Sequence, residues 1–392
     1  MRLLFYADGR SPITLNWLDH WLKRGDEVHL VSSYPCDPIP GLASQEVVPV
    51  AFSQVKKASG VREGQNASSQ RIWGAGSLRA RMLVREWLGP FTIPAASQAL
   101  RAAVDRIQPD LVHAMRIPYE GMTAAAADLK VPLLISVWGN DFSLHARSSP
   151  WMALWTRRAL IKTDALQADC RRDVRLAGEW GFQPGKPNLV IPGNGGIRTE
   201  IFHRPAEPIQ QPVVINPRGF RGYVRNDSFF KSIPLVLKQI PEARFICSAM
   251  AGEPQAETWI EKLGIRQVVQ LLPQQPHARM GDIFRKANVL VSASTHDGTP
   301  NSVLEGMACG CFPVAGRLES LEEWITHGRN GLLVDPADPG DLAQAVLTSL
   351  TDPELRQKAA EENASLLASR AEYSNCMQQA GDLYREMISK GN

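Results

Sequence analysis

The feature that most constrains the fold is an alternation of short apolar runs with helical patterns, interrupted once by a proline-rich stretch. Runs rich in Val, Ile, Leu and aromatic residues are typical of buried strands, and amphipathic patterns such as TLNWLDHWLKRG (14–25) stand between them. This order predicts parallel sheets covered by helices on both faces, an α/β fold. The expected strands are residues 2–8, 27–33, 110–115, 132–138, 164–170 and 188–193, then 213–217, 244–250, 268–273, 287–294, 311–316 and 331–336.

The interruption predicts two domains. A chain of 392 residues is too long for one core. Residues 204–212, RPAEPIQQP, read as a stiff extended linker because three prolines restrict the backbone. We therefore expect one doubly wound, Rossmann-like domain over 1–203, a second over 213–370, and a helical tail over 371–392. Ligands bind beyond the carboxyl ends of strands in such sheets, so two facing sheets would form a deep cleft.

Composition excludes some classes of protein. A net charge of +3 is too small to indicate a nucleic-acid-binding protein. No apolar run approaches 18 residues, so no membrane span is expected. The opening MRLLFYADGR reads as a first strand rather than a signal peptide.

The cysteines predict a reduced, cytoplasmic protein. Six are scattered along the chain without paired spacing. Cys309 and Cys311 flank one glycine, but no second Cys or His pair has the spacing of a zinc site, so small buried residues in a packed turn are the better interpretation.

The stretch HDGTPNSVLEGMACG, residues 296–310, predicts a ligand site. It follows an expected buried strand with a loop containing Gly298 and Pro300, and an apolar helix begins near Ser302. Free N–H groups and the positive end of the helix dipole suit a phosphate there. Asp297 and Glu305 flank those groups, and carboxylates accept hydrogen bonds from sugar hydroxyls. An anion beside vicinal hydroxyls describes a nucleotide-sugar.

An ordinary structural interpretation of the same stretch stays open. Ser302-x-x-Glu305 has the spacing of a capping box, in which the glutamate satisfies N–H groups at the start of its own helix. Asp297 is also a common turn residue.

Asp297-x7-Glu305, followed by GMACGCFPVAG, resembles the acidic-x7-Glu signature of the family-4 retaining glycosyltransferases. The resemblance covers nearly the whole chain. It implies a GT-B fold, two facing Rossmann-like domains with the nucleotide-sugar in the second, the acceptor in the first and the tail packed back on the first. The further segments that carry the resemblance are SVWGNDF (136–142), VIPGNGGIRTEIF (190–202), NPRGFRGYVRNDSFF (216–230) and NGLLVDPADPGDLAQAV (330–346).

The resemblance implies roles for four catalytic residues. Glu305 would accept hydrogen bonds from the ribose, and Asp297, which stands where relatives usually have Glu, would contact the donor sugar. Arg218 matches the phosphate-binding arginine. Arg225 is our candidate for the position where relatives usually have lysine, and the alternative is that Arg225 is a solvated loop cation. The guanidinium groups of Arg218 and Arg225 both suit a phosphate. The expected donor-binding loop adds Gly298, Thr299, Pro300, Asn301 and Ser302.

The expected acceptor side departs from the family pattern. Trp138 replaces a frequent histidine and offers a stacking face and one donor that does not titrate. Asp141 either binds a substrate hydroxyl or caps the next helix. His113 ends a strand near the expected cleft, with a satisfied core imidazole as the alternative. The segment ADGRSP replaces a Gly-Gly loop; there Gly9 and Ser11 would offer N–H groups to a phosphate, and Arg10 would either add charge or face solvent.

Residues 51–90 are basic, with seven Lys or Arg against two Glu, and contain Trp73 and Trp87. Such a segment either contacts an anionic membrane or a lipid-linked acceptor, or forms a solvated loop with one amphipathic helix; the second interpretation is favoured.

The expected function is transfer of a sugar with retention from a nucleotide-diphosphate sugar to a carbohydrate, lipid-linked or small-molecule acceptor. No divalent metal and no cofactor are expected, because arginines would neutralise the leaving diphosphate. The expected location is the cytoplasm, with peripheral contact to the inner face of the membrane left open. A dinucleotide-dependent dehydrogenase is disfavoured, since Gly-x-Gly-x-x-Gly does not follow the first strand. A non-catalytic nucleotide-sugar- or glycan-binding relative stays as the alternative, and a nucleotide-sugar 2-epimerase is a weaker one.

Overall fold

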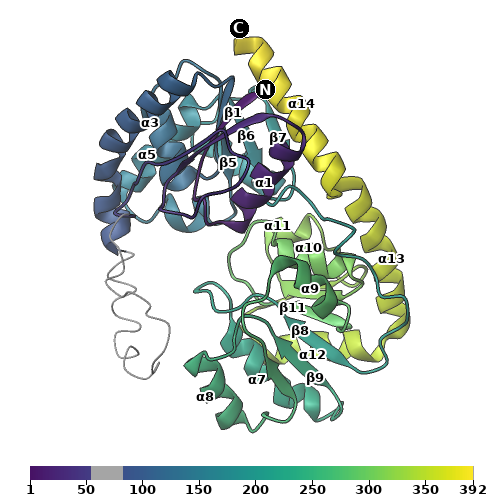
Figure 1. Cartoon of the computed structure of the whole chain (residues 1–392). Helices are drawn as coiled ribbons and strands as arrows, with labels where there is room; N and C mark the ends of the chain where they lie inside the picture. The colour runs from purple at the N-terminus through teal and green to yellow at the C-terminus, as the bar shows by residue number, and fades with distance from the viewer. Residues whose placement is uncertain (54–82, 392) are drawn as a thin grey trace. The chain divides into compact units, whose positions relative to one another are not determined.

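The computed structural model describes residues 1–53 and 83–391. Most of the basic segment 51–90, including Trp73 and six of its seven Lys or Arg, therefore lies outside the described residues; Arg85 and Trp87 are described, and Trp87 is 47% exposed. The chain forms two compact units (Figure 1). Unit 1 comprises Met1–Asp169, Asp173–Asn194 and Met377–Asn392, and unit 2 comprises Cys170–Arg172 and Gly195–Cys376.

The boundary between the units lies after Asn194, not at residue 203 as the sequence suggested. The residues that follow pack inside unit 2. Ile197 donates its N–H to the carbonyl of Ala371 (2.6 Å). Gly196 approaches the same carbonyl so closely that a Cβ would stand 2.8 Å from its oxygen. The proline pattern in the sequence indicates where the chain is stiff. Contacts with residues far along the chain, such as Ala371, determine to which unit the residues after Asn194 belong.

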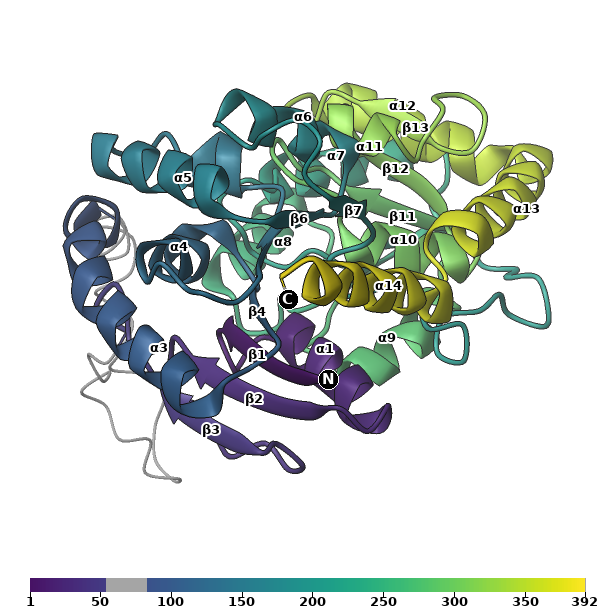
Figure 2. The same cartoon turned by 90° about the horizontal axis from the view of Figure 1, so that it is seen from above.

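Unit 1 contains a seven-stranded sheet in which every pair is parallel, in the order β3-β2-β1-β4-β5-β6-β7. Figure 2 shows β1, β2 and β3 side by side at one end. The edge strand β3 was not expected, because its half-exposed sequence SQEV has no apolar run. The strands are β1 (Arg2–Ala7), β2 (Glu27–Ser32), β3 (Ser44–Val47), β4 (Leu111–Ala114), β5 (Leu133–Val137), β6 (Ala165–Ala168) and β7 (Asn188–Val190).

Helices cover both faces of this sheet, as apolar side chains on both sides of its strands require. Leu4 and Tyr6 of β1 pack in a core with helices α3 to α6, while Leu3 and Phe5 point to the other face. The helical elements are α1 (Pro12–Lys23), η1 (Gly89–Thr92), α3 (Ile93–Ile107), η2 (Ile117–Gly121), α4 (Met122–Ala126), η3 (Asp141–His145), α5 (Pro150–Lys162) and α6 (Arg171–Glu179).

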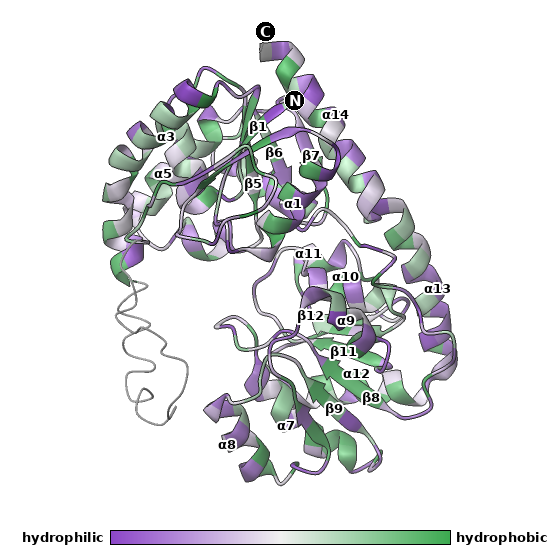
Figure 3. Cartoon of the chain, viewed as in Figure 1, coloured by the Kyte–Doolittle hydropathy of each residue, from purple (hydrophilic) through white to green (hydrophobic). Residues whose placement is uncertain are grey.

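Unit 2 contains a six-stranded parallel sheet in the order β10-β9-β8-β11-β12-β13. Its strands are strongly hydrophobic, as Figure 3 shows for β8, β9 and β11, and this is typical of a sheet buried on both faces. The strands are β8 (Val213–Asn216), β9 (Arg244–Cys247), β10 (Val269–Leu271), β11 (Val289–Ser292), β12 (Phe312–Gly316) and β13 (Leu332–Val334).

Alternate residues of this sheet enter two separate cores. Val214 packs with α7, α8 and α12, and its neighbour Ile215 packs with α9, α10 and α13. As expected, Asp352 caps α13 by accepting the N–H of Leu355 (2.8 Å). The helices are α7 (Asn226–Leu237), α8 (Pro254–Leu263), α9 (His277–Phe284), α10 (Asn301–Ala308), α11 (Glu319–Glu322), α12 (Pro339–Thr351) and α13 (Pro353–Arg370).

The last helix, α14 (Tyr373–Gly391), begins in unit 2 and continues in unit 1 from Met377. In unit 1, Tyr384 stacks on Trp21 of α1 with ring centroids 4.6 Å apart. The end of the chain thus completes the face of the first sheet that α1 covers.

Candidate active site

Two loops meet at the carboxyl edge of the second sheet. The strand order reverses between β8 and β11, and such a switch point is where open α/β sheets bind ligands. The loop after β8 lies beside the loop after β11, because Arg225 donates its N–H to Ala293 (2.8 Å) and Thr295 donates to Tyr223 (2.8 Å). This pairing brings the predicted arginines next to the predicted acidic loop.

Arg218 and Asp297 form a nearly buried ion pair, with side chains only 9% and 13% exposed. The Arg218 guanidinium also donates to Ser302 Oγ (3.2 Å). Burial raises the pKa of Asp297, and the charge of Arg218 opposes that shift. The Nε–H of Arg218 is buried and has no hydrogen-bond partner among the described residues, which leaves one donor for a ligand.

Side chains from other segments of unit 2 hold the predicted donor loop in place. The carbonyl of Asp297 accepts from Ser320 (2.9 Å) and Arg172 (2.6 Å), and Thr299 Oγ1 accepts from the indole of Trp324 (2.9 Å). Sequence reasoning missed these supports, since they come from distant parts of the chain.

The loop ends at the amino terminus of α10. Pro300 is its N-cap residue and makes no side-chain cap, so the first N–H groups of the helix are not capped in that way. The Oδ1 atom of Asn301 is buried without a hydrogen-bond partner in the described chain. The loop from Gly298 to Ser302 therefore presents helix N–H groups beside a cation and an unsatisfied acceptor, a combination that suits a phosphorylated sugar.

Glu305 is not part of a capping box. Its carboxylate, in a residue only 5% exposed, accepts a hydrogen bond from Nε2 of His277 (2.8 Å), and Ser302 is bound by Arg218 instead. The hydrogen bond to Glu305 raises the pKa of His277. Sequence reasoning missed His277, which directly follows the LLPQQP stretch of residues 271–276.

The raised pKa of His277 predicts a pH-dependent contribution to stability. A raised folded-state pKa adds stability below the ordinary value of 6.5 that is lost as the pH rises through the folded-state value. The His277→Gln variant should therefore have a lower free energy of unfolding than the wild type at about pH 6, and a smaller deficit at about pH 9. Urea unfolding over this pH range measures it, with His203→Gln as the exposed control. A deficit that is equal at every pH would contradict the prediction.

Arg225 lies in the same loop but is bound differently. Its guanidinium forms two hydrogen bonds to Asp227, through Nε (2.8 Å) and Nη2 (2.9 Å), and its side chain is 37% exposed. Its role as the second phosphate cation stays a prediction, since a phosphate would have to compete with this carboxylate.

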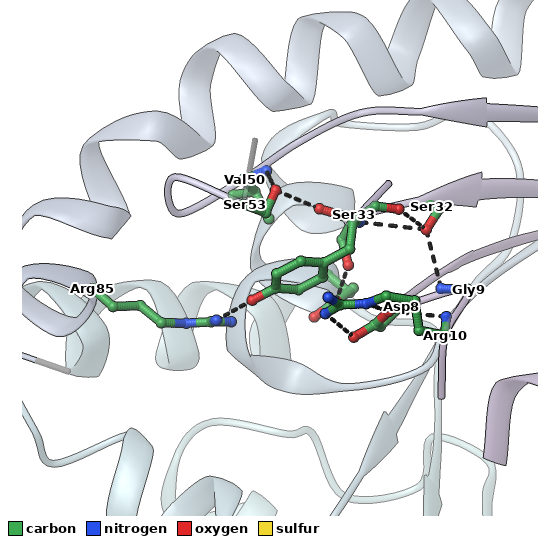
Figure 4. Close-up of polar contacts among 10 residues, drawn as sticks. Asp8, Gly9, Arg10, Ser32, Ser33, Val50, Ser53 and Arg85 are labelled. Carbon is green, nitrogen blue, oxygen red and sulfur yellow. Dashed lines mark hydrogen bonds and ion pairs between the residues drawn. The ribbon is translucent and has the colours of Figure 1, made fainter. Parts of the chain in front are cut away.

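The N–H groups expected to bind a phosphate in ADGRSP are already used inside unit 1. Gly9 donates to Ser32 Oγ (3.0 Å), and Ser11 donates to the carbonyl of Asp8 (3.0 Å). Arg10 forms an ion pair with Asp8 (2.9 Å). The N–H groups expected to bind a phosphate are thus already hydrogen-bonded within unit 1, and a phosphate would have to displace the serine and aspartate oxygens that accept from Gly9 and Arg10 (Figure 4).

Two other expected cleft residues are structural. His113 is fully buried, with Nδ1 2.6 Å from Tyr384 Oη and Nε2 2.7 Å from Ser136 Oγ. Burial lowers its pKa to about 3, so it stays neutral. Asp141 is also buried, and its carboxylate accepts from the guanidinium of Arg116 (3.0 Å) and the N–H of Trp138 (3.1 Å). Both are satisfied core groups rather than substrate ligands.

Trp138 does line a pocket, at the carboxyl edge of the first sheet. This pocket of about 340 Å³ lies where strand order reverses between β1 and β4, and Arg116 and Tyr119 also line it. A larger cavity of about 580 Å³ lies at the amino ends of β8, β9 and β10, lined among others by Arg244. This cavity lies at the opposite edge of the sheet from the loops after β8 and β11, where the strand order reverses, so it is not part of the candidate site.

The cysteines form no disulfide in the described chain, and the six thiols are free. Cys311 donates to the carbonyls of Phe284 (3.2 Å) and Ala287 (3.3 Å). Burial raises the pKa of Cys309 to about 12, and neither Cys309 nor Cys311 belongs to a cluster with metal-ligand geometry in the described ranges. Both thiols are buried at the turn between α10 and β12, as the packed-turn interpretation expects. Within residues 1–53 and 83–391, no helix is long and apolar enough to cross a membrane.

Comparison with known families matches both units. Residues 197–365 match the glycosyl transferases group 1 model, and residues 9–193 match the glycosyl transferase 4-like domain model. A D-inositol 3-phosphate glycosyltransferase of Corynebacterium kroppenstedtii is 32% identical over 276 residues, 59% of this chain and 61% of that protein. One of that name from Thermobifida fusca is 25% identical over 47% of this chain and 46% of its own length. The chain thus spans less than two thirds of these curated relatives.

Solved structures show the fold. Sucrose-phosphate synthase from Thermosynechococcus elongatus superposes with a TM-score of 0.73 at 16% identity over 100% of both chains. Anabaena Alr3699/HepE in complex with UDP gives 0.73 at 15% identity over 98% of this chain and 100% of its own. With two Rossmann-like units that match these models and structures, the chain belongs to the group 1 glycosyltransferases of GT-B fold.

Proposed function

We propose that this chain is a retaining glycosyltransferase that uses a nucleotide-diphosphate sugar bound in unit 2. The observation that carries the proposal is the group formed by Arg218, Asp297, Asn301 and Glu305. It combines a cation with an unpartnered Nε–H, a helix amino terminus, a buried unsatisfied amide oxygen and a buried carboxylate. The cation and the helix amino terminus complement a diphosphate, the amide oxygen complements a sugar, and the buried carboxylate complements a ribose.

Each part of the donor has a suitable partner. A diphosphate would attract the guanidinium of Arg218 and so loosen its ion pair with Asp297. The freed carboxylate would then accept hydrogen bonds from sugar hydroxyls. Glu305 would use its oxygens for ribose hydroxyls while His277 fixes its orientation.

Catalysis would stabilise the charge that develops on the leaving diphosphate. Arg218 and the N–H groups of α10 would contact that diphosphate, and Arg225 would join them if its guanidinium leaves Asp227. In this proposal the departing phosphate takes the acceptor's proton on the same face of the sugar, so no protein base is needed, and the arginines neutralise the diphosphate in place of a divalent metal.

The comparisons indicate which donors and acceptors should be tested first. Alr3699/HepE has been solved in complex with UDP and with UDP-glucose, so uridine donors come first. The curated relatives are D-inositol 3-phosphate glycosyltransferases by name, so phosphorylated polyols are reasonable acceptors. Unit 1 would bind that acceptor.

A thermal-shift panel tests the donor site. UDP, GDP, ADP and CMP are added to the protein with magnesium or with EDTA. A ligand at 100 times its dissociation constant stabilises the folded state by about 2.7 kcal/mol, so one nucleoside diphosphate should raise the midpoint equally in both conditions. Donor hydrolysis or transfer then separates an enzyme from a non-catalytic relative. No shift with any nucleotide would reject the donor site, and a shift only with magnesium would reject metal independence.

A further inference from the structure

The cavity of about 580 Å³ at the amino ends of β8, β9 and β10 lies within unit 2 and takes no part in the proposed reaction. Its volume is in the usual range of about 300–1,000 Å³ for small-molecule sites. Residues 207–211 of the proline-rich stretch line it, and prolines stiffen that stretch. Val213, Phe245 and Ile246, none more than 8% exposed, give it an apolar part. The cavity is therefore built from well-ordered backbone and core residues.

Positive charge is in excess among the residues that line this cavity. Arg244, Arg285 and Lys286 are the cations, and Glu207 is the carboxylate among its described lining residues. Arg285 is paired with Asp282 (2.6 Å), whereas Arg244 and Lys286 form no ion pair with any carboxylate of the described chain. Two unpaired cations face one carboxylate, and this balance favours an anionic ligand.

The chain orients Arg244 without any ligand. Its Nη1 group donates to the carbonyls of Glu242 (2.8 Å) and Ala243 (3.0 Å), in the turn between α7 and β9. Its Nε and Nη2 groups make no hydrogen bond within residues 1–53 and 83–391. A guanidinium that is held by one nitrogen and keeps donors on the other two suits the bidentate contact of a phosphate.

Four glutamines add neutral hydrogen-bonding groups to the cavity. Each side-chain amide offers two donor hydrogens and one acceptor oxygen, and none of the four amides is hydrogen-bonded within the described part of the chain. Strand β10 is an edge strand, so alternate N–H and C=O groups of its backbone have no partner strand. Such groups suit hydroxyls or the edge of a base. The glutamines are Gln210, Gln211, Gln267 and Gln270.

Helix α9 connects this cavity to the donor site. Arg285 and Lys286 line the cavity and directly follow the last residue of the helix. His277 is its first residue, and its imidazole is hydrogen-bonded to the carboxylate of Glu305 (2.8 Å). These two ends are about 12 Å apart, because a helix rises by 1.5 Å per residue. A displacement of α9 at the cavity would therefore be felt at Glu305.

The segment before the proline-rich stretch contacts both ends of α9. Arg285 donates through Nη1 to the carbonyl of Ile201 (2.8 Å). The ring of the next residue, Phe202, packs on the ring of His277 with centroids 5.1 Å apart. The helix lies close to this segment, because a Cβ at Gly281 would clash with the same carbonyl oxygen. An anion that draws Arg285 away from this carbonyl would loosen the segment that supports His277.

We propose that this cavity is a regulatory site for a small phosphorylated molecule, and that its occupation weakens nucleotide binding at Glu305 through α9. Arg244 and Lys286 bind the phosphate, and the glutamine amides bind the rest of the molecule. Only the regulatory part rests on the proposed function. The phosphate can belong to a sugar phosphate or to a mononucleotide, and the chemistry at Arg244 is the same for both.

Calorimetric titration of the full chain without a nucleoside diphosphate tests the binding part. The ligands are inorganic phosphate, ribose, ribose 5-phosphate and AMP. Ribose 5-phosphate or AMP should bind more tightly than phosphate, the tighter of the two identifies the source, and ribose should not bind. Arg244→Gln and Lys286→Gln should each weaken binding by about tenfold. Lys286 is exposed, so its replacement should not disturb the fold. Arg329→Gln, an exposed arginine of unit 2 paired with Glu362, is the matched control.

Two measurements test the regulatory part. The tighter phosphate ligand should raise the Kd of UDP by about fivefold or more, and UDP should raise the Kd of that ligand by the same factor. The effect should level off as the ligand saturates its site, whereas direct competition with UDP would keep rising. Without UDP, the ligand should speed amide hydrogen exchange at α9, which reports local loosening. Lys286→Gln should need a higher ligand concentration for both effects.

The pattern of results decides the proposal. No binding of any phosphate ligand, or binding that neither variant weakens, would overturn it. Binding at the cavity that changes neither the UDP affinity nor the exchange at α9 would overturn it as well. If UDP itself does not bind, the proposed donor site is rejected, and the exchange at α9 still decides whether the cavity acts on that helix.

Discussion

Replacing Arg218 with alanine is expected to lower the rate of sugar transfer by about 10²–10³-fold, the usual effect of removing one group that stabilises transition-state charge. The same change leaves the nearly buried carboxylate of Asp297 without its ion-pair partner. Stability should fall as well, because an unpaired buried charge is costly. Transfer rates and urea unfolding measure the two effects, and Arg221→Ala, an exposed arginine of the same loop, is the control.

A second variant separates the two effects of Arg218. Adding Asp297→Asn to Arg218→Ala removes the unpaired charge, so the free energy of unfolding should recover towards that of the wild type. Transfer should stay low, because both the phosphate cation and the sugar-binding carboxylate are then missing. If transfer recovers together with stability, Arg218 acts only through the fold.

Replacing Glu305 with glutamine is expected to weaken binding of the nucleoside diphosphate by about 10–100-fold. Hydrogen bonds to a charged group contribute about 1.5–3 kcal/mol, and the amide lacks the charge and one acceptor oxygen. A 2′,3′-dideoxy nucleotide provides the matched ligand, since it lacks the ribose hydroxyls. The wild type should prefer the ordinary nucleotide, and Glu305→Gln should lose most of that preference.

The control for Glu305 is Glu322→Gln, whose side chain is 50% exposed. It should bind both nucleotides as the wild type does. If Glu305→Gln weakens the ordinary and the dideoxy nucleotide equally, Glu305 does not contact the ribose. In that case its hydrogen bond to His277 would be its main role.

The fold could be predicted from the sequence because its signal is local. The twelve expected strands lie within a few residues of β1, β2 and β4 to β13, since buried parallel strands read as continuous apolar runs. The exception is β3, an edge strand with polar residues. The signal for the predicted donor loop was also local, because Asp297, Asn301 and Glu305 lie within nine consecutive residues.

The partners of the site residues could not be predicted, because they come from elsewhere in the chain. His277 meets Glu305 across 28 residues, and Tyr384 meets His113 across 271. A histidine at the end of a strand reads the same whether it faces a ligand or a tyrosine from the last helix. For the same reason, the N–H groups of Gly9 and Ser11 looked available until the structure placed their acceptors.

The positive φ of Tyr119 affects which substitutions are expected at this position during evolution. A positive φ costs a tyrosine on the order of 1–3 kcal/mol, whereas glycine adopts it at little cost. Because most chains are only marginally stable, such a cost persists only where the side chain returns a comparable benefit. Drift at this position would thus be expected to run towards glycine once the ring is no longer used. A tyrosine retained here would mark lineages that still need the ring, which packs in the core of unit 1 and lines its pocket.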